Sequence, residues 1–406
     1  MMVREWVYKA LVDVVLKKTY SNLYLKNHLQ EVDEKDQALA SAIFYGTLQN
    51  YRLCEEDWKR FAKGKVNKKA AILLTMSVYQ LRFLNRVPAY AVLDDANRIA
   101  ARSFPESKGL VNAILHKVID SKMPMPADPA AALALKTSLP EWLIRLWIKQ
   151  YGPKEAYQFA MASLATLPVT VRINPRKMPP EQLENTGRLK EAKNGLYHYE
   201  GHQIGTDPLY FQGKISVQDP GSYEIARWMD VQPGESVLDL CAAPGTKTMA
   251  MAEMSDDQAQ ITAQDLHEPR VRLIENDAHR LGLKNITAIT KDSTIAGEKK
   301  YDKVLCDVPC SGFGILSRKP DMKLQIAPET IDQLLPIQKQ LLESGAAQLK
   351  DGGTLVYSTC TLDQKENEKQ VQAFLEAHPE FTLEKQETLI PDCEHGGFYL
   401  ARLHKS

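Results

Sequence analysis

Two of the six cysteines in this chain stand where a thiol could act as a nucleophile. Cys310 follows the run Asp307-Val-Pro, and Cys360 follows Ser358-Thr, so each lies beside turn residues after a strand-like segment. Adjacent parallel strands lie about 5 Å apart, and both thiols could therefore reach one cleft. A thiolate is the strongest common nucleophile, whereas a metal site would need more ligands. These two thiols are the candidate chemical centre, with no metal expected.

The other cysteines and the composition indicate an ordinary cytosolic protein. A lone cysteine is most often a small buried apolar residue, and this interpretation suits Cys54, Cys241, Cys306 and Cys393. Six cysteines among 406 residues, with no C-x-x-C pair, do not form a disulfide scaffold. A content of 44% hydrophobic and 25% charged residues excludes wholesale disorder. Apolar runs are far shorter than the ~20 residues of a membrane span, and the first residues lack a signal-peptide core.

A loop of small residues follows the strand-like segment 236–240. It reads Cys241-Ala-Ala-Pro-Gly245-Thr-Lys247. Small side chains let the backbone pass close to a ligand, and the helix that follows offers free N–H groups at its start. The loop is not a Walker phosphate loop, because Thr246 separates Gly245 from Lys247, and its single glycine excludes a dinucleotide fingerprint.

Aspartates end the next strand-like segments, at Asp265, near Asp292 and at Asp307. Ligands of an open parallel sheet bind outside the carboxyl ends of its strands. One aspartate at such an end is about as often a helix cap. Several successive strands that each end in an aspartate or in the small-residue loop indicate a nucleoside pocket without a phosphate-binding loop. In such a pocket Asp265 can accept hydrogen bonds from a ribose diol.

The elements that must position these side chains alternate between strand and helix from about residue 216. Strands are expected at 236–240, 261–265, 286–290, 303–307 and 354–358. Helices separate them, such as 268–281 and 335–349, the latter with Pro336 in its first turn. This alternation predicts an α/β fold with a parallel sheet and right-handed crossovers. Two further runs, 381–389 and 398–403, predict an antiparallel hairpin at the sheet edge.

The first 125 residues differ in pattern and in charge. Apolar spacing predicts an all-helical region, with a buried central helix near 71–84. The region holds 20 Lys and Arg residues and 13 Asp and Glu residues. The basic residues include a cluster of six: Lys59, Arg60, Lys63, Lys65, Lys68 and Lys69. The cluster can attract phosphates, although a charge run is more often a solvated loop between helices. Three prolines between 124 and 129 predict a linker at 126–139, followed by a small α/β subdomain at 140–215.

These motifs resemble those of the RNA 5-methylcytosine methyltransferases. The resemblance rests on Asp307-Val-Pro-Cys310-Ser-Gly, on Ser358-Thr-Cys360-Thr and on the run from Leu238 to Lys247. Segments 214–220, 318–321 and 397–399 are also similar. Segments 36–46 and 111–115 resemble a NusB-type RNA-binding helical domain. This pairing of domains is similar to the RsmB (Fmu/Sun) branch, whose members methylate a cytosine in 16S ribosomal RNA.

The resemblance implies a class I methyltransferase fold that uses S-adenosylmethionine. The implied domains are a NusB-like domain at 1–125 and a methyltransferase domain at 216–406. Cys360 would attack the cytosine, Cys310 would assist product release, and Asp307 would hydrogen-bond N3 or the amino group of the base. Asp265 would hold the cofactor ribose and Asp292 the adenine side. The implied remaining cofactor contacts are Cys241, Ala242, Ala243, Pro244, Gly245, Thr246, Lys247 and Asp307.

Two departures and two alternatives accompany this interpretation. Thr246 stands where the family usually has glycine, so a positive φ there would be strained. His116 and Lys117 replace a commoner arginine pair. A non-catalytic RNA-binding factor would leave both cysteines unexplained, and a sister enzyme could act on transfer RNA or large-subunit RNA. The expected partner is small-subunit ribosomal RNA, bound by a monomer.

Overall fold

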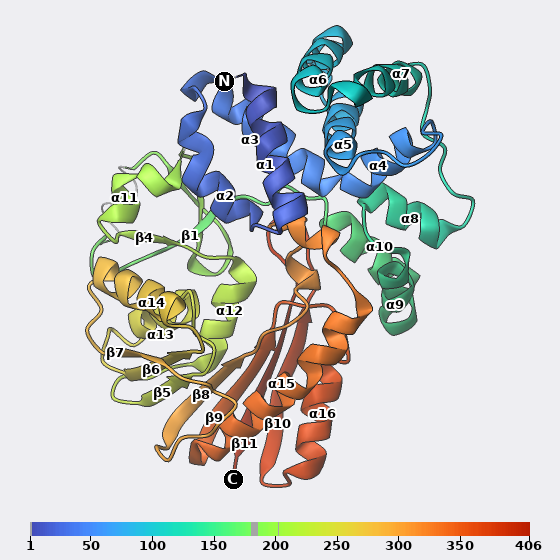
Figure 1. Cartoon of the computed structure of the whole chain (residues 1–406). Coiled ribbons are helices and arrows are strands. Elements are labelled where there is room, and N and C mark those ends of the chain that lie inside the picture. The colour runs from blue at the N-terminus through green and yellow to red at the C-terminus, as the bar shows by residue number, and fades with distance from the viewer. Residues whose placement is uncertain (1, 180–185, 202) are drawn as a thin grey trace. The chain divides into compact units, whose positions relative to one another are not determined.

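We describe residues 2–179, 186–201 and 203–406 of a computed structural model (Figure 1). The chain forms two compact units. The first comprises Met1–Leu164 together with Leu316–Ile326, and the second comprises Ala165–Ile315 together with Ala327–Ser406. None of the helices in these described ranges is both long enough and apolar enough to cross a membrane.

The first unit is helical, as predicted for the N-terminal region. Helix α5 (Lys68–Phe83) is buried on most faces, and it begins where the Asn67 side chain accepts a 2.8 Å hydrogen bond from the Lys69 N–H. It ends before Pro88, after which the next helix starts. The helices that contribute to the same apolar core are α1 (Val3–Lys17), α2 (Ser21–His28), α3 (Glu34–Gln49), α4 (Tyr51–Lys59), α6 (Ala89–Ser103) and α7 (Lys108–Ile119).

The predicted linker at 126–139 differs from the structure, where most of this stretch forms helix α8 (Pro129–Thr137). Pro129 occupies the first helical position, which needs no N–H, and the Asp128 carboxylate accepts a 2.9 Å hydrogen bond from the Ala131 N–H. Pro129 therefore starts a helix, whereas Pro124 and Pro126 lie before it in a segment without regular secondary structure.

The predicted subdomain at 140–215 is also divided differently. Its two helices, α9 (Glu141–Tyr151) and α10 (Pro153–Ala162), belong to the first unit, which continues to Leu164. The physical reason is that their apolar faces pack on helices: Trp147 of α9 is fully buried and contacts Phe159 of α10 edge to face.

A short insertion completes the first unit. Residues 316–326 contain the 3₁₀ helix η7 (Pro320–Leu324), and the Asp321 carboxylate accepts a 2.5 Å hydrogen bond from the Ser21 hydroxyl of α2. The Lys323 ammonium donates to the Thr137 carbonyl over 3.0 Å. The segment that follows the Cys310 loop in sequence is thus anchored among helices of the N-terminal region.

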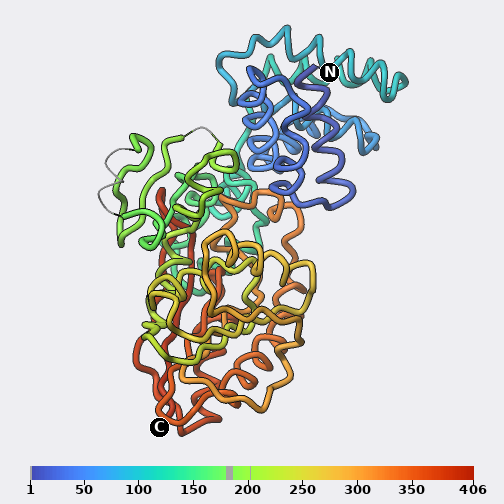
Figure 2. Tube along the Cα trace, turned by 90° about the vertical axis from the view of Figure 1, so that its left-hand side faces the viewer, coloured from blue at the N-terminus to red at the C-terminus, as the bar shows by residue number. Residues whose placement is uncertain are grey.

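The second unit is built on a seven-stranded sheet with the order β10-β11-β9-β8-β5-β6-β7. Its five parallel strands confirm the predicted strand-and-helix alternation, and β11 runs antiparallel to β9. The C-terminal hairpin, red in Figure 2, forms the edge as predicted. The strands are β5 (Ser236–Asp239), β6 (Gln260–Asp265), β7 (Ile286–Thr290), β8 (Tyr301–Asp307), β9 (Leu349–Thr359), β10 (Phe381–Leu389) and β11 (Phe398–Lys405).

Helices cover both faces of this sheet (Figure 1). Helices α12 (Pro220–Met229), α13 (Thr246–Met254) and α14 (Glu268–Leu281) pack on the face that includes Leu305 and Val356. Helices α15 (Pro328–Ala347) and α16 (Glu368–Ala377) cover the other face, which includes Val304 and Leu355. Alternate residues of β8 and β9 are therefore buried on opposite sides, as a central parallel strand requires.

Helix α15 is longer than the predicted 335–349, because it begins at Pro328 and continues through Pro336. A proline inside a helix removes one backbone hydrogen bond. Ile331, five residues before Pro336, is buried, so the helix before the proline is also packed against the unit.

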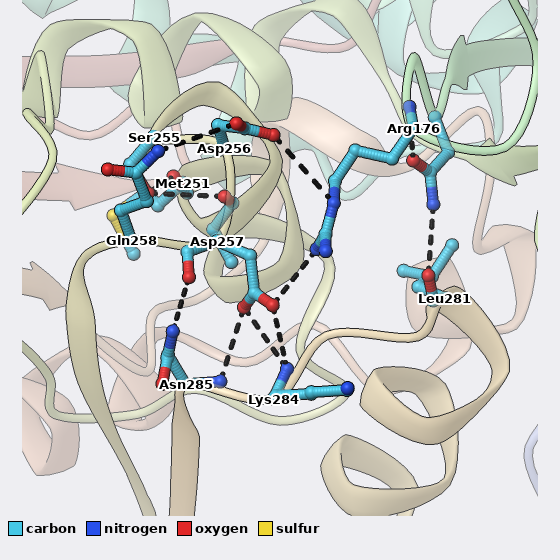
Figure 3. Close-up of polar contacts among 11 residues, drawn as sticks. Arg176, Met251, Ser255, Asp256, Asp257, Gln258, Leu281, Lys284 and Asn285 are labelled. Carbon is cyan, nitrogen blue, oxygen red and sulfur yellow. Dashed lines mark hydrogen bonds and ion pairs between the residues drawn. The ribbon is translucent and has the colours of Figure 1, made fainter.

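A four-stranded antiparallel sheet, ordered β2-β3-β1-β4, precedes the large sheet in sequence. Its strands are β1 (Thr170–Ile173), β2 (Leu189–Glu191), β3 (Tyr197–Tyr199) and β4 (Ile215–Val217). The buried Arg172 of β1 forms a 2.7 Å ion pair with Glu253 of α13. The Asp257 carboxylate accepts hydrogen bonds from Arg176 and from the Lys284 N–H (Figure 3). These contacts hold the small sheet to α13 and to the turn before β7.

Candidate active site

The two candidate thiols meet where β8 and β9 end. The register of the two parallel strands places Asp307 beside Ser358, and the Val308 N–H donates to the Ser358 carbonyl over 3.1 Å. The loops that carry Cys310 and Cys360 therefore leave the sheet next to one another. Their sulfur atoms lie 3.3 Å apart, and the Cys360 N–H donates to the Cys310 sulfur over 3.3 Å. The predicted convergence of the two thiols is confirmed.

The environment of Cys310 favours its neutral form. The hydrogen bond with Cys360, followed by burial, raises the pKa of the Cys310 thiol well above its usual value. Cys310 thus remains protonated near neutral pH. A protonated thiol beside a second sulfur can donate a hydrogen bond to it, which stabilises negative charge on that second sulfur.

The remaining cysteines lie outside this pair. Cys54 and Cys306 are buried, as expected, and Cys241 is half-buried in the loop after β5. The expectation of burial was wrong for Cys393, which is exposed. It lies in the connection between β10 and β11.

Asp307 is held by two partners at the end of β8. Its Oδ2 forms a 2.7 Å ion pair with the Lys247 ammonium from the first turn of α13, and its Oδ1 accepts a 2.8 Å hydrogen bond from the Ser358 hydroxyl. Burial alone would lower the pKa of Lys247, but the Asp307 carboxylate outweighs it and the pKa is raised. Lys247 is therefore a cation, and it also interacts electrostatically with Cys360.

The loop after β5 has the geometry expected of a backbone that passes close to a ligand. Gly245 precedes α13 with φ +102°, a conformation that side chains disfavour. Thr246 is the first residue of α13 and has no positive φ, so the strain expected from the missing glycine does not arise. The Ala242 N–H donates to the Gln264 carbonyl of β6 over 2.8 Å, which fixes the loop beside the next strand.

Asp265 lies at the end of β6, as predicted, and is 3% exposed. Its carboxylate accepts a 3.2 Å hydrogen bond from the His267 N–H and lies 3.4 Å from the Arg270 guanidinium. Arg270 also donates to the Ala243 carbonyl over 2.9 Å. Arg270, which the sequence did not single out, thus connects Asp265 to the loop after β5.

Asp292 follows β7 and is exposed. Its carboxylate accepts hydrogen bonds from the hydroxyl and the N–H of Thr294, and these bonds lower its pKa. This arrangement is that of a turn cap, the alternative that the sequence left open for each strand-end aspartate. A cofactor role for Asp292 remains a prediction.

Asp239, at the end of β5, is a buried acid to which the sequence analysis gave no role. It is 1% exposed and accepts a 2.7 Å hydrogen bond from the Thr248 hydroxyl, and burial raises its pKa to about 7. Asp239 ends a strand next to the small-residue loop, and the other aspartates were identified as candidate ligand contacts because they also end strands.

Together these groups fit a nucleoside ligand. A buried carboxylate at Asp265 can accept from a ribose diol, and the loop from Cys241 to Lys247 brings backbone close to a ligand at a helix N-terminus. In the described part of the chain, no cluster of three or more His, Cys, Asp or Glu side chains could hold a metal ion. The parallel sheet and these strand-end groups define a class I S-adenosylmethionine-dependent methyltransferase fold.

Comparison with known proteins identifies the family. Residues 226–401 match the family model described as 16S rRNA methyltransferase RsmB/F, and residues 1–120 match the NusB family. The Bacillus subtilis (strain 168) protein "Probable ribosomal RNA small subunit methyltransferase B" is 37% identical over 93% of this chain and 89% of its own length. The Escherichia coli O6:H1 protein "Ribosomal RNA small subunit methyltransferase B" is 30% identical, over 93% and 92%.

A solved structure supports the fold over the whole chain. The crystal structure of PH0851 superposes with a TM-score of 0.85 at 25% identity and covers 100% of this chain and 99% of that one. The chain belongs to the ribosomal RNA small subunit methyltransferase B family. It is an S-adenosylmethionine-dependent RNA methyltransferase.

Proposed function

We propose that the protein methylates carbon 5 of a cytosine in 16S ribosomal RNA, through a covalent bond between Cys360 and carbon 6 of the base. The observation that carries this proposal is the pair of sulfur atoms 3.3 Å apart, next to Asp307 at the ends of β8 and β9. A methyltransferase that acts on an already nucleophilic atom has no need of a thiol pair, whereas carbon 5 of cytosine is a poor nucleophile.

The local charges favour Cys360 as the attacking thiol. Lys247 is a cation that interacts with Cys360, and a nearby ammonium stabilises a thiolate. Cys310 is kept neutral, and its thiol can donate a hydrogen bond to the Cys360 sulfur. In this proposal the two thiols differ in role: Cys360 attacks the base, and Cys310 holds the proton. The family resemblance supports the same assignment.

The reaction follows from this difference. The Cys360 thiolate forms a bond to carbon 6, and the electron pair of the C5–C6 double bond moves to carbon 5. When bound, S-adenosylmethionine would supply the methyl group to carbon 5 as an electrophilic sulfonium and would leave as the neutral thioether. After the transfer, a base from the solvent takes the proton from carbon 5, the C5–H electron pair re-forms the C5–C6 double bond, and the C6–S bond breaks with its electron pair on the Cys360 sulfur. The neutral Cys310 thiol assists this last step by donating a hydrogen bond to the departing Cys360 thiolate.

Asp307 orients the base in this scheme. Its carboxylate is fixed by Lys247 and Ser358, so it is prearranged to accept a hydrogen bond from the cytosine amino group. Prearranged groups of this kind stabilise charge as it develops in the transition state. The base must leave its stack to reach the thiols, at a cost of a few kcal/mol that is smaller in RNA loops.

The first unit supplies a basic surface suited to the same substrate. Lys63, Lys65, Lys68 and Lys69 are exposed, and among the described residues none of them has an ion pair. Three of these lysines line an open groove together with Asn67 at the start of α5. Unpaired lysines attract RNA phosphates by counterion release. The match to the NusB family supports an RNA-binding role for this unit.

The direct test is to incubate the purified protein with 16S ribosomal RNA and methyl-labelled cofactor. We expect label in the RNA, recovered as 5-methylcytosine and mapped by bisulfite sequencing. Cys360→Ala should abolish the label while cofactor binding stays unchanged, and the matched control Cys393→Ala, at an exposed thiol, should keep full activity. Label on another base, or only on transfer RNA or 23S RNA, would contradict the proposal.

A further inference from the structure

The loop that carries Cys310 is held on both sides of that residue. The Pro309 carbonyl, just before it, accepts a 3.0 Å hydrogen bond from the Gln338 side chain. The Ser311 N–H, just after it, donates to the Glu366 carboxylate over 2.9 Å, and the Ser311 hydroxyl donates to the other oxygen of that carboxylate. The loop has no regular secondary structure, so these side chains determine where the Cys310 sulfur lies.

Gln338 and Glu366 also contact each other, and both are fully buried. The Gln338 amide donates to Glu366 Oε2 over 2.9 Å, and the Tyr357 hydroxyl donates to the Glu366 carbonyl over 2.6 Å. Burying a carboxylate is costly unless its oxygens are hydrogen-bonded. Burial raises the pKa of Glu366, and the Ser311 and Gln338 bonds oppose that shift. Burying the Glu366 carboxylate therefore costs desolvation free energy, which an apolar side chain of the same size would not require.

Three separate elements meet in this contact. Gln338 lies in α15, Glu366 lies in the turn between β9 and α16, and Pro309 and Ser311 follow β8. The Ser311 hydroxyl also lies 2.6 Å from the Thr361 hydroxyl, directly after Cys360. The Glu366–Gln338 pair thus joins the loop of one cysteine to the segment that carries the other.

We propose that Glu366, together with Gln338, is a positioning residue for Cys310, and that it sets the contact between the two thiols on which product release depends. This inference rests on the proposed function. Cys360 directly follows β9, and its carbonyl accepts a 3.0 Å hydrogen bond from the Gly314 N–H. Loss of the Glu366 contact therefore leaves the attack by Cys360 intact and slows the elimination that Cys310 assists.

The test is Glu366→Gln, which keeps the shape of the side chain and replaces one acceptor oxygen by a donor. The new amide nitrogen can only donate, so either the Ser311 hydroxyl must reverse its hydrogen bond or the Ser311 N–H and the Gln338 amide lose their acceptor. In both cases the loop exchanges a charged acceptor for a neutral one. We expect a rapid first round of methylation, a kcat lowered about tenfold, and a covalent protein–RNA adduct that survives denaturant. The matched control is Glu376→Gln, at an exposed carboxylate of α16, which should behave as the unchanged protein does.

A second variant keeps the inference testable if Glu366→Gln does not fold. Gln338→Met removes the hydrogen bonds to Pro309 and Glu366 while it preserves an unbranched side chain of similar length. It should also accumulate the adduct, with unchanged cofactor binding. A purely structural role would lower adduct formation and turnover together, and that result in both variants would overturn the inference.

The outcome separates this inference from the function on which it rests. Cys310→Ala serves as the reference, because it removes the thiol itself. If Cys310→Ala accumulates the adduct but Glu366→Gln and Gln338→Met do not, the positioning role is wrong and the function stands. If no variant forms an adduct, and the unchanged protein makes no 5-methylcytosine, the proposed function itself is wrong.

Discussion

The sulfur atoms of Cys310 and Cys360 lie 3.3 Å apart at the ends of two adjacent parallel strands. This distance is that of a hydrogen-bonded thiol pair, because a disulfide bond would require about 2.05 Å. One sulfur can therefore hold the proton while the other holds the charge. A division of this kind is what an enzyme needs if one thiol must attack a base and later leave it.

The backbone of Gly314 packs closely against the backbone of Gly397 and of Cys360. A Cβ placed on Gly314 would lie 2.0 Å from the Gly397 carbonyl oxygen and 2.9 Å from the Cys360 carbonyl oxygen. Both obstacles are backbone atoms, so they cannot move aside cheaply. We expect Gly314→Ala to lower the free energy of unfolding by about 2–3 kcal/mol and to impair methylation.

Urea unfolding and methyl-transfer assays check this expectation. Gly205→Ala is the matched control, because a Cβ there meets no atom within 4 Å and the residue has no positive φ. Equal stability of the two variants would show that the glycine contact does not constrain the segment that carries Cys360.

The buried Asp239 carboxyl should give the protein a distinctive pH dependence. Burial raises its pKa to about 7, above the value of about 3.9 in an unfolded chain. Between these two values the folded state binds more protons than the unfolded state, so stability falls as the pH rises from about 4 to about 7. Asp239→Asn mimics the protonated form and should remove this fall. The free energy of unfolding of Asp239→Asn, relative to that of the unchanged protein, should therefore increase between pH 4 and pH 7 and stay constant above pH 7.

Urea unfolding at a series of pH values, with the two proteins compared at each, measures this difference. Asp292→Asn is an informative control, since hydrogen bonds from Thr294 lower the pKa of Asp292. Its contribution to stability has the opposite sign and is lost as the pH falls. A stability difference for Asp239→Asn that does not change between pH 4 and 7 would contradict the expected titration.

The exposed lysines at the start of α5 should act on RNA affinity and leave the chemical step unchanged. We expect the triple variant Lys65→Glu, Lys68→Glu, Lys69→Glu to raise the KM for RNA, with little change in kcat. The slope of log affinity against log salt should fall by about two, because each phosphate contact contributes about 0.7–0.9.

Binding measurements at several salt concentrations check this prediction. The control is the double variant Lys149→Glu, Lys154→Glu, at exposed lysines of the same unit that lie outside the basic cluster. An effect of the control in proportion to its smaller charge change would show that only the overall charge matters and that the α5 groove has no specific role.

The sequence predicted those parts of the fold that depend on local patterns. The expected strand at 286–290 matches β7, and the expected helix at 268–281 matches α14, because strand-length apolar runs and a 3.6-residue period determine them. The meeting of Cys310 and Cys360 followed from the same alternation, since adjacent parallel strands bring their carboxyl ends together. The individual helices and strands were thus easier to predict than the boundaries between domains.

What the sequence did not predict depends on contacts between distant residues. The Glu366–Gln338 contact joins residues 28 positions apart in different elements, and no spacing rule indicates it. The unit boundary after Leu164 follows from how α9 and α10 pack, and the run of prolines suggested a linker instead. Asp239 could have been found, since it ends a strand as Asp265 does. Its burial was visible only in the fold.

The measurement that tests the central claim most directly is the covalent trapping of RNA by single cysteine variants. Cys310→Ala and Cys360→Ala are each incubated with 16S ribosomal RNA and cofactor and then resolved under denaturing conditions. We expect Cys310→Ala to give a band of protein covalently bound to RNA, and Cys360→Ala to give none. A band with Cys360→Ala and none with Cys310→Ala would reverse the two roles, and the absence of a band from both would contradict the covalent mechanism.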